Sequence, residues 1–156
     1  MADTAQALGQ IRFEVGGLND RTLAAVLPLV ARHPPFLAYS FGVMVPALMD
    51  QLRHGANALA IYQGILVGYA GWLRVDDVHA SRWQRHECDL PAPNWEHGNA
   101  AIVTVTVADN KSLLSPLLHA ISHVCAGVPV YRMRSFQDGR PDQRRPPITG
   151  RKYRVL

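Results

Sequence analysis

The sequence predicts an α+β fold: a mixed, mostly antiparallel sheet flanked by helices. Apolar segments at 58–62 and 65–72 are separated by Gln63 and Gly64, which is typical of a β-hairpin with a short turn. Residues 99–134 then follow the pattern strand, tight loop, helix, strand, which places two strands in parallel. Helical periodicity before the hairpin and isolated strands after it favour α+β over a regular alternation of the two.

Length and composition indicate one globular domain over residues 1–156. Hydrophobic residues make up 48% of the chain and charged residues 18%, which argues against disorder. No apolar run approaches the ~20 residues that span a bilayer, and the first residues lack the pattern of a secretory signal. We therefore expect a cytoplasmic protein without an integral membrane segment, and free thiols at Cys88 and Cys125.

The net charge of +4 is unevenly distributed, because a Pro- and Arg-rich segment at 138–156 is strongly basic. Such a segment could meet nucleic acid, an anionic membrane surface or an acidic protein, or could simply be a solvated tail. No RNA-binding aromatic signature or zinc-finger spacing is present, so we expect no nucleic-acid partner.

The first half of the chain predicts a short edge strand at 11–15 and two helices. The first helix begins at Asn19 or Asp20, which are both good N-caps, and must end before His33 because two prolines follow it. The second helix begins near Ser40 and ends about residue 54.

The remaining elements are less regular. Pro46 is tolerated in the second helix if it lies in the first turn. A short helix and a loop are predicted for residues 73–98. For residues 138–156 the sequence predicts a loop with a last short strand at 153–156.

The strand-loop-helix part of residues 99–134 carries the first functional signal. Asp109, Asn110 and Ser112 can all cap the helix that follows, and Gly127 is a plausible helix end. A helix N-terminus presents free N–H groups and the positive end of the helix dipole. This loop is therefore suited to an anion or a thioester.

The arrangement resembles the GNAT acetyltransferase fold, in which such a loop is usually glycine-rich and cradles the pyrophosphate of coenzyme A. Residues 108–113 contain no glycine, and their bulky side chains with the carboxylate of Asp109 would hinder a diphosphate. Either the donor is not coenzyme A, or the resemblance is to the fold alone.

A narrower resemblance is to the RTX-toxin-activating lysine acyltransferases. Its short motifs occur in the same order and cover roughly residues 30–142: Ala-Arg-His-Pro-Pro-Phe at 31–36, Val-Pro-Ala-Leu at 45–48, Ala-Leu-Ala-Ile-Tyr at 58–62 and Leu-Val-Gly-Tyr-Ala-Gly-Trp at 66–72. This family moves a fatty acyl group from acyl carrier protein to a lysine of a protoxin. The resemblance therefore implies a protein substrate with an acceptor lysine.

The resemblance assigns His33 as the catalytic histidine. A lysine amine attacks a thioester only when neutral, and histidine is suited to take its proton. A histidine that merely ends a helix is the structural alternative. Counted along the strand, the family's catalytic aspartate matches Thr104, and a count anchored on Asp109 gives Ile102 instead. Neither side chain can stabilise an imidazolium as a carboxylate does. Thr104 could instead serve strand packing, and Asp76, Asp77 or Asp109 could supply the carboxylate.

The remaining candidate site residues are assigned to substrate binding. Tyr69 and Trp72 could line an acyl channel or belong to the core, and their spacing places them on opposite faces of a regular strand. Asn110, Lys111 and Ser112 would lie near the thioester.

We expect no metal site. His119 and His123 are one helical turn apart, but the sequence offers no third ligand beside them.

The leading hypothesis is a lysine acyltransferase that uses an acyl-thioester co-substrate and holds no cofactor tightly. Acyl carrier protein is the favoured donor, because the basic C-terminal segment would attract an acidic carrier, and acyl-coenzyme A is the other. The alternatives are an acetyl-coenzyme A-dependent N-acetyltransferase for a small amine and a non-catalytic binding or regulatory relative. The oligomeric state stays open, a homodimer included. The distance from His33 to a carboxylate discriminates best.

Overall fold

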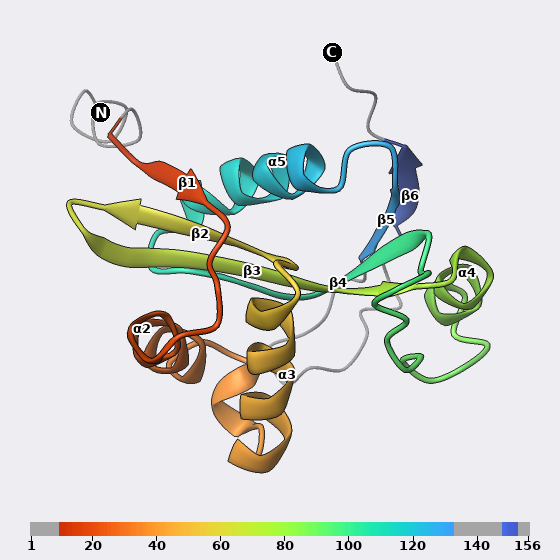
Figure 1. The fold of residues 1–156 in the computed structure, drawn as a ribbon, viewed down its shortest axis with the longest axis horizontal. Helices are drawn as coiled ribbons and strands as arrows, with labels where there is room; N and C mark the ends of the chain where they lie inside the picture. The colour runs from red at the N-terminus through yellow and green to blue at the C-terminus, as the bar shows by residue number, and fades with distance from the viewer. Residues whose placement is uncertain (1–9, 133–147, 153–156) are drawn as a thin grey trace.

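The computed structural model describes residues 10–132 and 148–152, which form a six-stranded sheet with helices on both faces (Figure 1). The strands lie in the order β1 to β6, so each pairs with its neighbours in sequence. β4 and β5 are parallel and the other adjacent pairs are antiparallel. The predicted mixed, mostly antiparallel sheet is thus confirmed. No helix in these residues is long and apolar enough to cross a membrane.

The elements of the described chain follow one another in this order: β1 (Arg12–Glu14), α2 (Asp20–Ala31), the 3-10 helix η1 (Phe36–Ala38), α3 (Phe41–Arg53), β2 (Asn57–Tyr62), β3 (Ile65–Val75), α4 (Asp77–Gln84), β4 (Ala100–Ala108), the 3-10 helix η2 (Lys111–Leu113), α5 (Leu114–Val124), β5 (Pro129–Arg132) and β6 (Ile148–Lys152).

The predicted hairpin is formed by β2 and β3, which pair antiparallel. Its two turn residues, Gln63 and Gly64, have φ angles of 49° and 79°. Positive φ at both central positions matches the right-handed twist of the flanking strands. Glycine adopts this conformation freely, and this explains why Gly64 marks the turn in the sequence.

The N-terminal helices begin and end close to the predicted positions. The side chain of Asn19 accepts a hydrogen bond from the N–H of Thr22 at 2.8 Å, so Asn19 caps α2. Pro46 differs from its prediction, because it lies five residues after Phe41, the first residue of α3, and so in the second turn. Its missing N–H leaves the carbonyl of Gly42 without a helical partner, and exposed Gly42 can bond to water instead.

At the C-terminal end, the prediction of a loop is wrong for residues 148–152, which form β6 on the outer edge of β5. The pairing is a tertiary contact between segments 16 or more positions apart, which local composition does not reveal. The strand predicted at 153–156 lies outside the described residues.

Each face of the sheet is covered by its own helices (Figure 1). α2 and α3 pack on one face, where Leu29 and Leu52 meet Tyr69. α5 packs on the other face, where Leu117 meets Trp72. Tyr69 and Trp72 therefore lie on opposite faces, as their spacing predicts.

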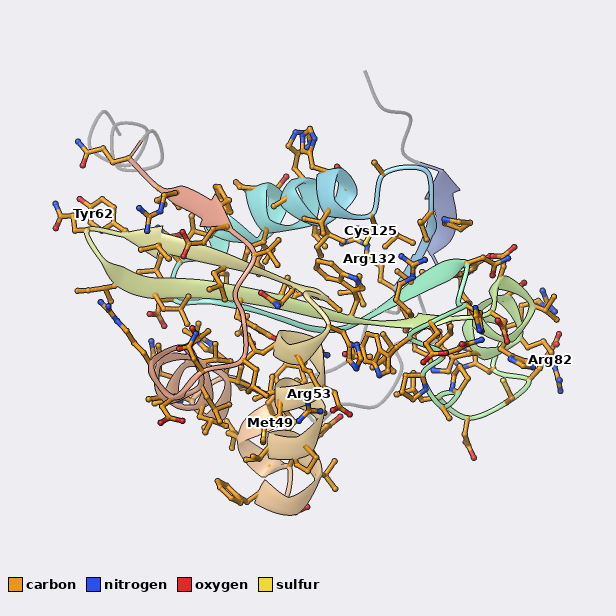
Figure 2. The ribbon with its side chains drawn as sticks, viewed as in Figure 1. Met49, Arg53, Tyr62, Arg82, Cys125 and Arg132 are labelled. Atoms are coloured by element: carbon orange, nitrogen blue, oxygen red, sulfur yellow. The ribbon has the colours of Figure 1, made fainter. Side chains whose placement is uncertain are left out.

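Cys125 lies on the side of α5 that faces the sheet (Figure 2) and is 2% exposed. Burial raises the pKa of its thiol to about 11, so the group stays protonated at neutral pH. It is a small core residue and not a nucleophile.

A buried polar network crosses the α3 face of the sheet. Gln51 is fully buried; its Nε2 donates to Thr104 Oγ1 at 2.8 Å, and the Tyr69 hydroxyl donates to its Oε1 at 2.8 Å. Each polar atom of the Gln51 amide thus has a partner, so burial of the group is compensated. The amide lies directly against Gly71, where a Cβ would come within 2.0 Å of Oε1.

We expect Gly71→Ala to destabilise the protein by about 2–4 kcal/mol, because the added methyl must displace a buried amide whose nitrogen and oxygen are both hydrogen-bonded. Urea unfolding followed by circular dichroism measures this change. Gly42→Ala is the matched control: a Cβ at exposed Gly42 meets nothing within 4 Å, and alanine favours the helix. A Gly71→Ala variant as stable as Gly42→Ala would show that the amide moves without cost.

Candidate active site

Two chain segments far apart in sequence meet where α2 and β4 end. α2 ends at Ala31, and the N–H of His33 donates to the Val30 carbonyl at 3.2 Å, which continues the last turn. β4 ends at Ala108, and the N–H of Asp109 donates to the Val67 carbonyl at 2.9 Å. The backbone of both His33 and Asp109 is therefore held by a regular element.

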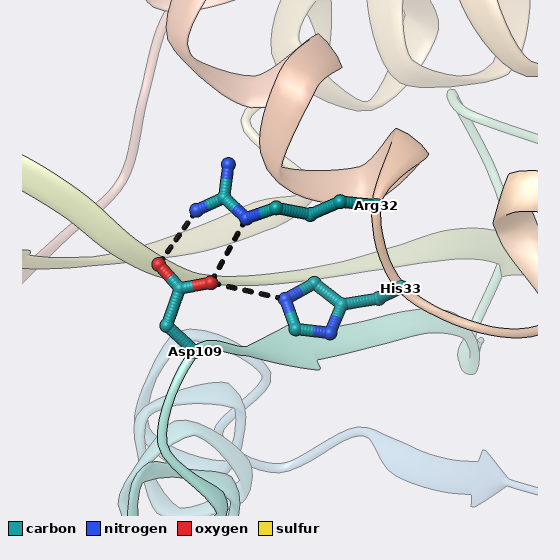
Figure 3. Close-up of polar contacts among 3 residues, drawn as sticks. All are labelled: Arg32, His33 and Asp109. Atoms are coloured by element: carbon teal, nitrogen blue, oxygen red, sulfur yellow. Dashed lines mark hydrogen bonds and ion pairs between the residues drawn. The ribbon is translucent and has the colours of Figure 1, made fainter.

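The side chains of His33 and Asp109 form the contact that the sequence left open. His33 Nε2 lies 3.1 Å from Asp109 Oδ1 (Figure 3). Arg32 binds the same carboxylate with two nitrogens: Nε donates to Oδ1 at 3.0 Å and Nη2 donates to Oδ2 at 2.6 Å. The two-point arginine contact fixes the carboxylate plane, and thereby the oxygen that faces the imidazole.

Electrostatics keep Asp109 ionised. The hydrogen bond from Arg32 lowers the pKa of Asp109 below its ordinary value, the contact with His33 adds to this effect, and partial desolvation opposes it. The side chains of Asp109 and His33 are 40% and 25% exposed, so the pair is open to solvent. A molecule in solution can therefore reach the imidazole.

This geometry makes His33 a suitable base. An ionised carboxylate only accepts hydrogen bonds, so the proton in the contact belongs to Nε2 and the lone pair of the neutral ring lies on Nδ1. Nδ1 can take a proton from a substrate, and Asp109 stabilises the resulting imidazolium.

Of the three acids considered from the sequence, the structure brings Asp109 to His33. Asp76 instead accepts a hydrogen bond from Asn94, and Asp77 accepts one from the Tyr131 hydroxyl. Arg32 was not singled out by sequence reasoning. Its position next to His33, at the C-terminal end of a helix, was the one available signal.

The other predicted catalytic residue, Thr104, lies in the buried network with Gln51. In the described part of the chain no hydrogen bond joins it to His33, and the carboxylate that contacts His33 belongs to Asp109, five residues later. Tyr69 and Trp72, predicted to bind substrate, are 0% and 2% exposed. Their place is in the two cores, so neither lines an open channel in this structure.

The loop residues Asn110, Lys111 and Ser112 are exposed beside Asp109. Asn110 Oδ1 accepts hydrogen bonds from the N–H of Ser112 at 2.9 Å and from its hydroxyl at 2.8 Å. The N–H of Leu113 donates to the Asn110 carbonyl at 3.0 Å. Two of the N–H groups expected to face a thioester or diphosphate are therefore already bonded within the loop.

An apolar cavity of about 280 Å³ lies between α2, η1 and α3. Its lining includes Ala31 and Phe36, which flank the His33 segment, together with Met44 and Leu48. The cavity is thus built by the same helices that position His33.

Comparison with solved structures identifies proteins of similar fold. Similar structures include a GNAT-family acetyltransferase from Streptococcus agalactiae (TM-score 0.56, 11% identity, 82% of this chain and 78% of that chain). A second is diaminobutyrate acetyltransferase EctA from Paenibacillus lautus, in complex with L-2,4-diaminobutyric acid and coenzyme A (TM-score 0.55, 11% identity, 82% and 68%). A third is the loading GNATL domain of CurA from Lyngbya majuscula (TM-score 0.53, 13% identity).

The fold is the GNAT acetyltransferase fold. The similarity to the CurA domain covers 79% of this chain and 64% of that domain, so the chain spans less than two thirds of it. No protein-family model and no curated protein matches the sequence. At 11–13% identity, the GNAT structures establish the fold and leave the reaction to be argued from the site.

Proposed function

We propose that this protein transfers an acyl group from a thioester donor to the amine of a lysine in a protein substrate. The observation that carries the proposal is the contact of 3.1 Å between His33 and Asp109 at a solvent-open site of a GNAT fold. A thioester is attacked by a neutral amine, and this pair supplies a base for the proton that the amine loses on attack.

The proposed reaction uses His33 as the proton carrier. The lysine nitrogen attacks the thioester carbonyl, and a C–N bond forms while His33 Nδ1 takes the amine proton. The tetrahedral intermediate then collapses, the C–S bond breaks, and the proton passes from His33 to the leaving thiolate. Asp109 stays ionised throughout and stabilises the imidazolium, while Arg32 holds the carboxylate in place.

Acyl carrier protein is the favoured donor. A diphosphate cradle requires free, converging N–H groups, and in this loop those of Ser112 and Leu113 are already bonded. The basic segment expected to attract an acidic carrier lies largely outside the described residues. The apolar cavity next to the His33 segment supports an acyl group longer than acetyl.

The choice of a protein lysine as acceptor rests on the resemblance to toxin-activating acyltransferases. The carboxylate 3.1 Å from His33 counts against the alternative of a non-catalytic relative.

A second candidate is an N-acetyltransferase for a small amine that uses acetyl-coenzyme A. It is favoured by the EctA structure, whose complex contains coenzyme A and a diamino acid. Stabilisation by acetyl-coenzyme A in a thermal shift assay would support this candidate.

The proposal is tested by offering the protein a panel of donors, namely acetyl- and decanoyl-coenzyme A and decanoyl-acyl carrier protein, with either a lysine-containing protein or a free diamine as acceptor. Mass spectrometry of the acceptor detects the transferred group and its position. We expect transfer to a lysine side chain, fastest from the carrier protein. Transfer from acetyl-coenzyme A to free diamines alone would support the second candidate, and no transfer from any donor would contradict both.

A further inference from the structure

The outer face of α5 carries two exposed histidines that the proposed reaction does not use. His119 and His123 are one helical turn apart and both are exposed. The opposite side of the helix, with Leu117, Ile121 and Cys125, is buried against the sheet. The imidazoles are therefore accessible to solutes, while the helix that carries them is anchored.

The two rings approach each other through their Nε2 atoms. His119 Nε2 and His123 Nε2 lie 3.0 Å apart, and the ring planes are almost perpendicular, at 88°. Zinc–imidazole bonds are about 2.05 Å long, so two ligand nitrogens lie about 2.9 Å apart at a right angle and about 3.3 Å apart at the tetrahedral angle. The observed separation falls between these limits. Small rotations of the two rings would let both Nε2 atoms bind one metal ion.

The backbone that carries the pair is well fixed. The Ser122 hydroxyl donates to the His119 carbonyl at 2.5 Å, and the N–H of Cys125 donates to the Ile121 carbonyl at 2.8 Å. Because the backbone is already ordered, metal binding costs little backbone entropy, and this favours affinity. Without a metal, one imidazole donates a proton to the other across the gap. When a metal ion binds, the ring that donated this proton carries it on Nδ1 instead, and the lone pairs of both Nε2 atoms bind the ion.

We propose that His119 and His123 form a two-point site for a divalent transition metal ion of the Zn²⁺ type. In the described residues no group of three metal-binding side chains occurs, so the remaining coordination positions are filled by water or by a donor from another molecule. The site is thus open and exchangeable, unlike a four-ligand structural zinc site. The sequence shows two histidines without a third ligand beside them, and the structure adds that the two rings meet.

A bound ion would link the last two turns of α5. Because the ion binds the helical form and holds both side chains together, it would stabilise the folded chain. This inference does not depend on the proposed acyl transfer.

The test is titration of the whole protein with ZnCl₂, by calorimetry and by thermal unfolding. We expect one site, and a rise in Tm of about 5 °C at a zinc concentration near 100 times Kd. His119→Gln and His123→Gln should each weaken binding by at least about tenfold, since even the loss of an indirect contact to a metal ligand costs 10- to 100-fold.

His97→Gln is the matched control, because His97 is also an exposed histidine, with a side chain 82% exposed. It should bind zinc as the wild type does, and circular dichroism verifies that all variants fold. Zinc binding that survives in both His119→Gln and His123→Gln would overturn the proposal. So would a wild-type protein that binds no zinc below about 1 mM.

Discussion

His33→Ala should lower kcat/KM for acyl transfer by about 10²- to 10⁴-fold, the usual contribution of a positioned general base. The reason is that alanine leaves the attacking amine without a proton acceptor while Asp109 and Arg32 keep their own contact. Initial rates with saturating donor and varied acceptor measure the change. In a second series with varied donor, KM for the donor should change little, because the imidazole acts on the amine.

His97→Ala is the control for this experiment, since it removes an exposed histidine of a turn whose ion-pair contact is with Glu96. Its activity should equal that of the wild type. Retention of activity within about threefold in His33→Ala would remove His33 from the mechanism while leaving the fold assignment intact.

Asp109→Asn should lower kcat by about 10²- to 10⁴-fold with a smaller effect on KM, because an amide stabilises neither the Nε2–H tautomer nor the imidazolium. Folding should be affected little. The Arg32–Asp109 pair is 49% and 40% exposed, and such exposed pairs contribute no more than about 1 kcal/mol. Single-turnover kinetics and urea unfolding of the same preparation separate the two effects.

Arg32→Gln distinguishes orientation from charge in this pair. It removes both arginine contacts and leaves the contact between Asp109 and His33 possible, so we expect a loss of about tenfold or less. A larger loss in Arg32→Gln than in Asp109→Asn would mean that the arginine itself contacts the substrate.

Local patterns predicted most of the elements. The Gln63–Gly64 turn, the Asn19 cap and the strand-loop-helix of β4 and α5 each depend on residues close together in sequence, so they were correct to within a few positions. β6 was missed, because its pairing with β5 joins residues 16 or more apart in sequence.

The candidate site, like the fold, was predicted only in its local features. Sequence reasoning proposed His33 through its motif and the two prolines after it, and named Asp109 as one of three acids. It could not choose among them, because 76 positions separate Asp109 from His33 and their contact depends on how α2 packs over the end of β4. Thr104 was assigned by counting along a strand. Such a count does not show which side chain a packed helix places beside the strand, here Gln51 of α3.

What the sequence by itself determined is the α+β architecture, the hairpin, and a histidine held at the end of a helix before two prolines. These follow from periodicity and backbone restriction, which act over a few residues. Only the tertiary structure decided that Asp109, oriented by Arg32, faces His33. It also decided that the Nε2 atoms of His119 and His123 face each other. Both are convergences of side chains in space, and side-chain direction is settled only when the elements have packed.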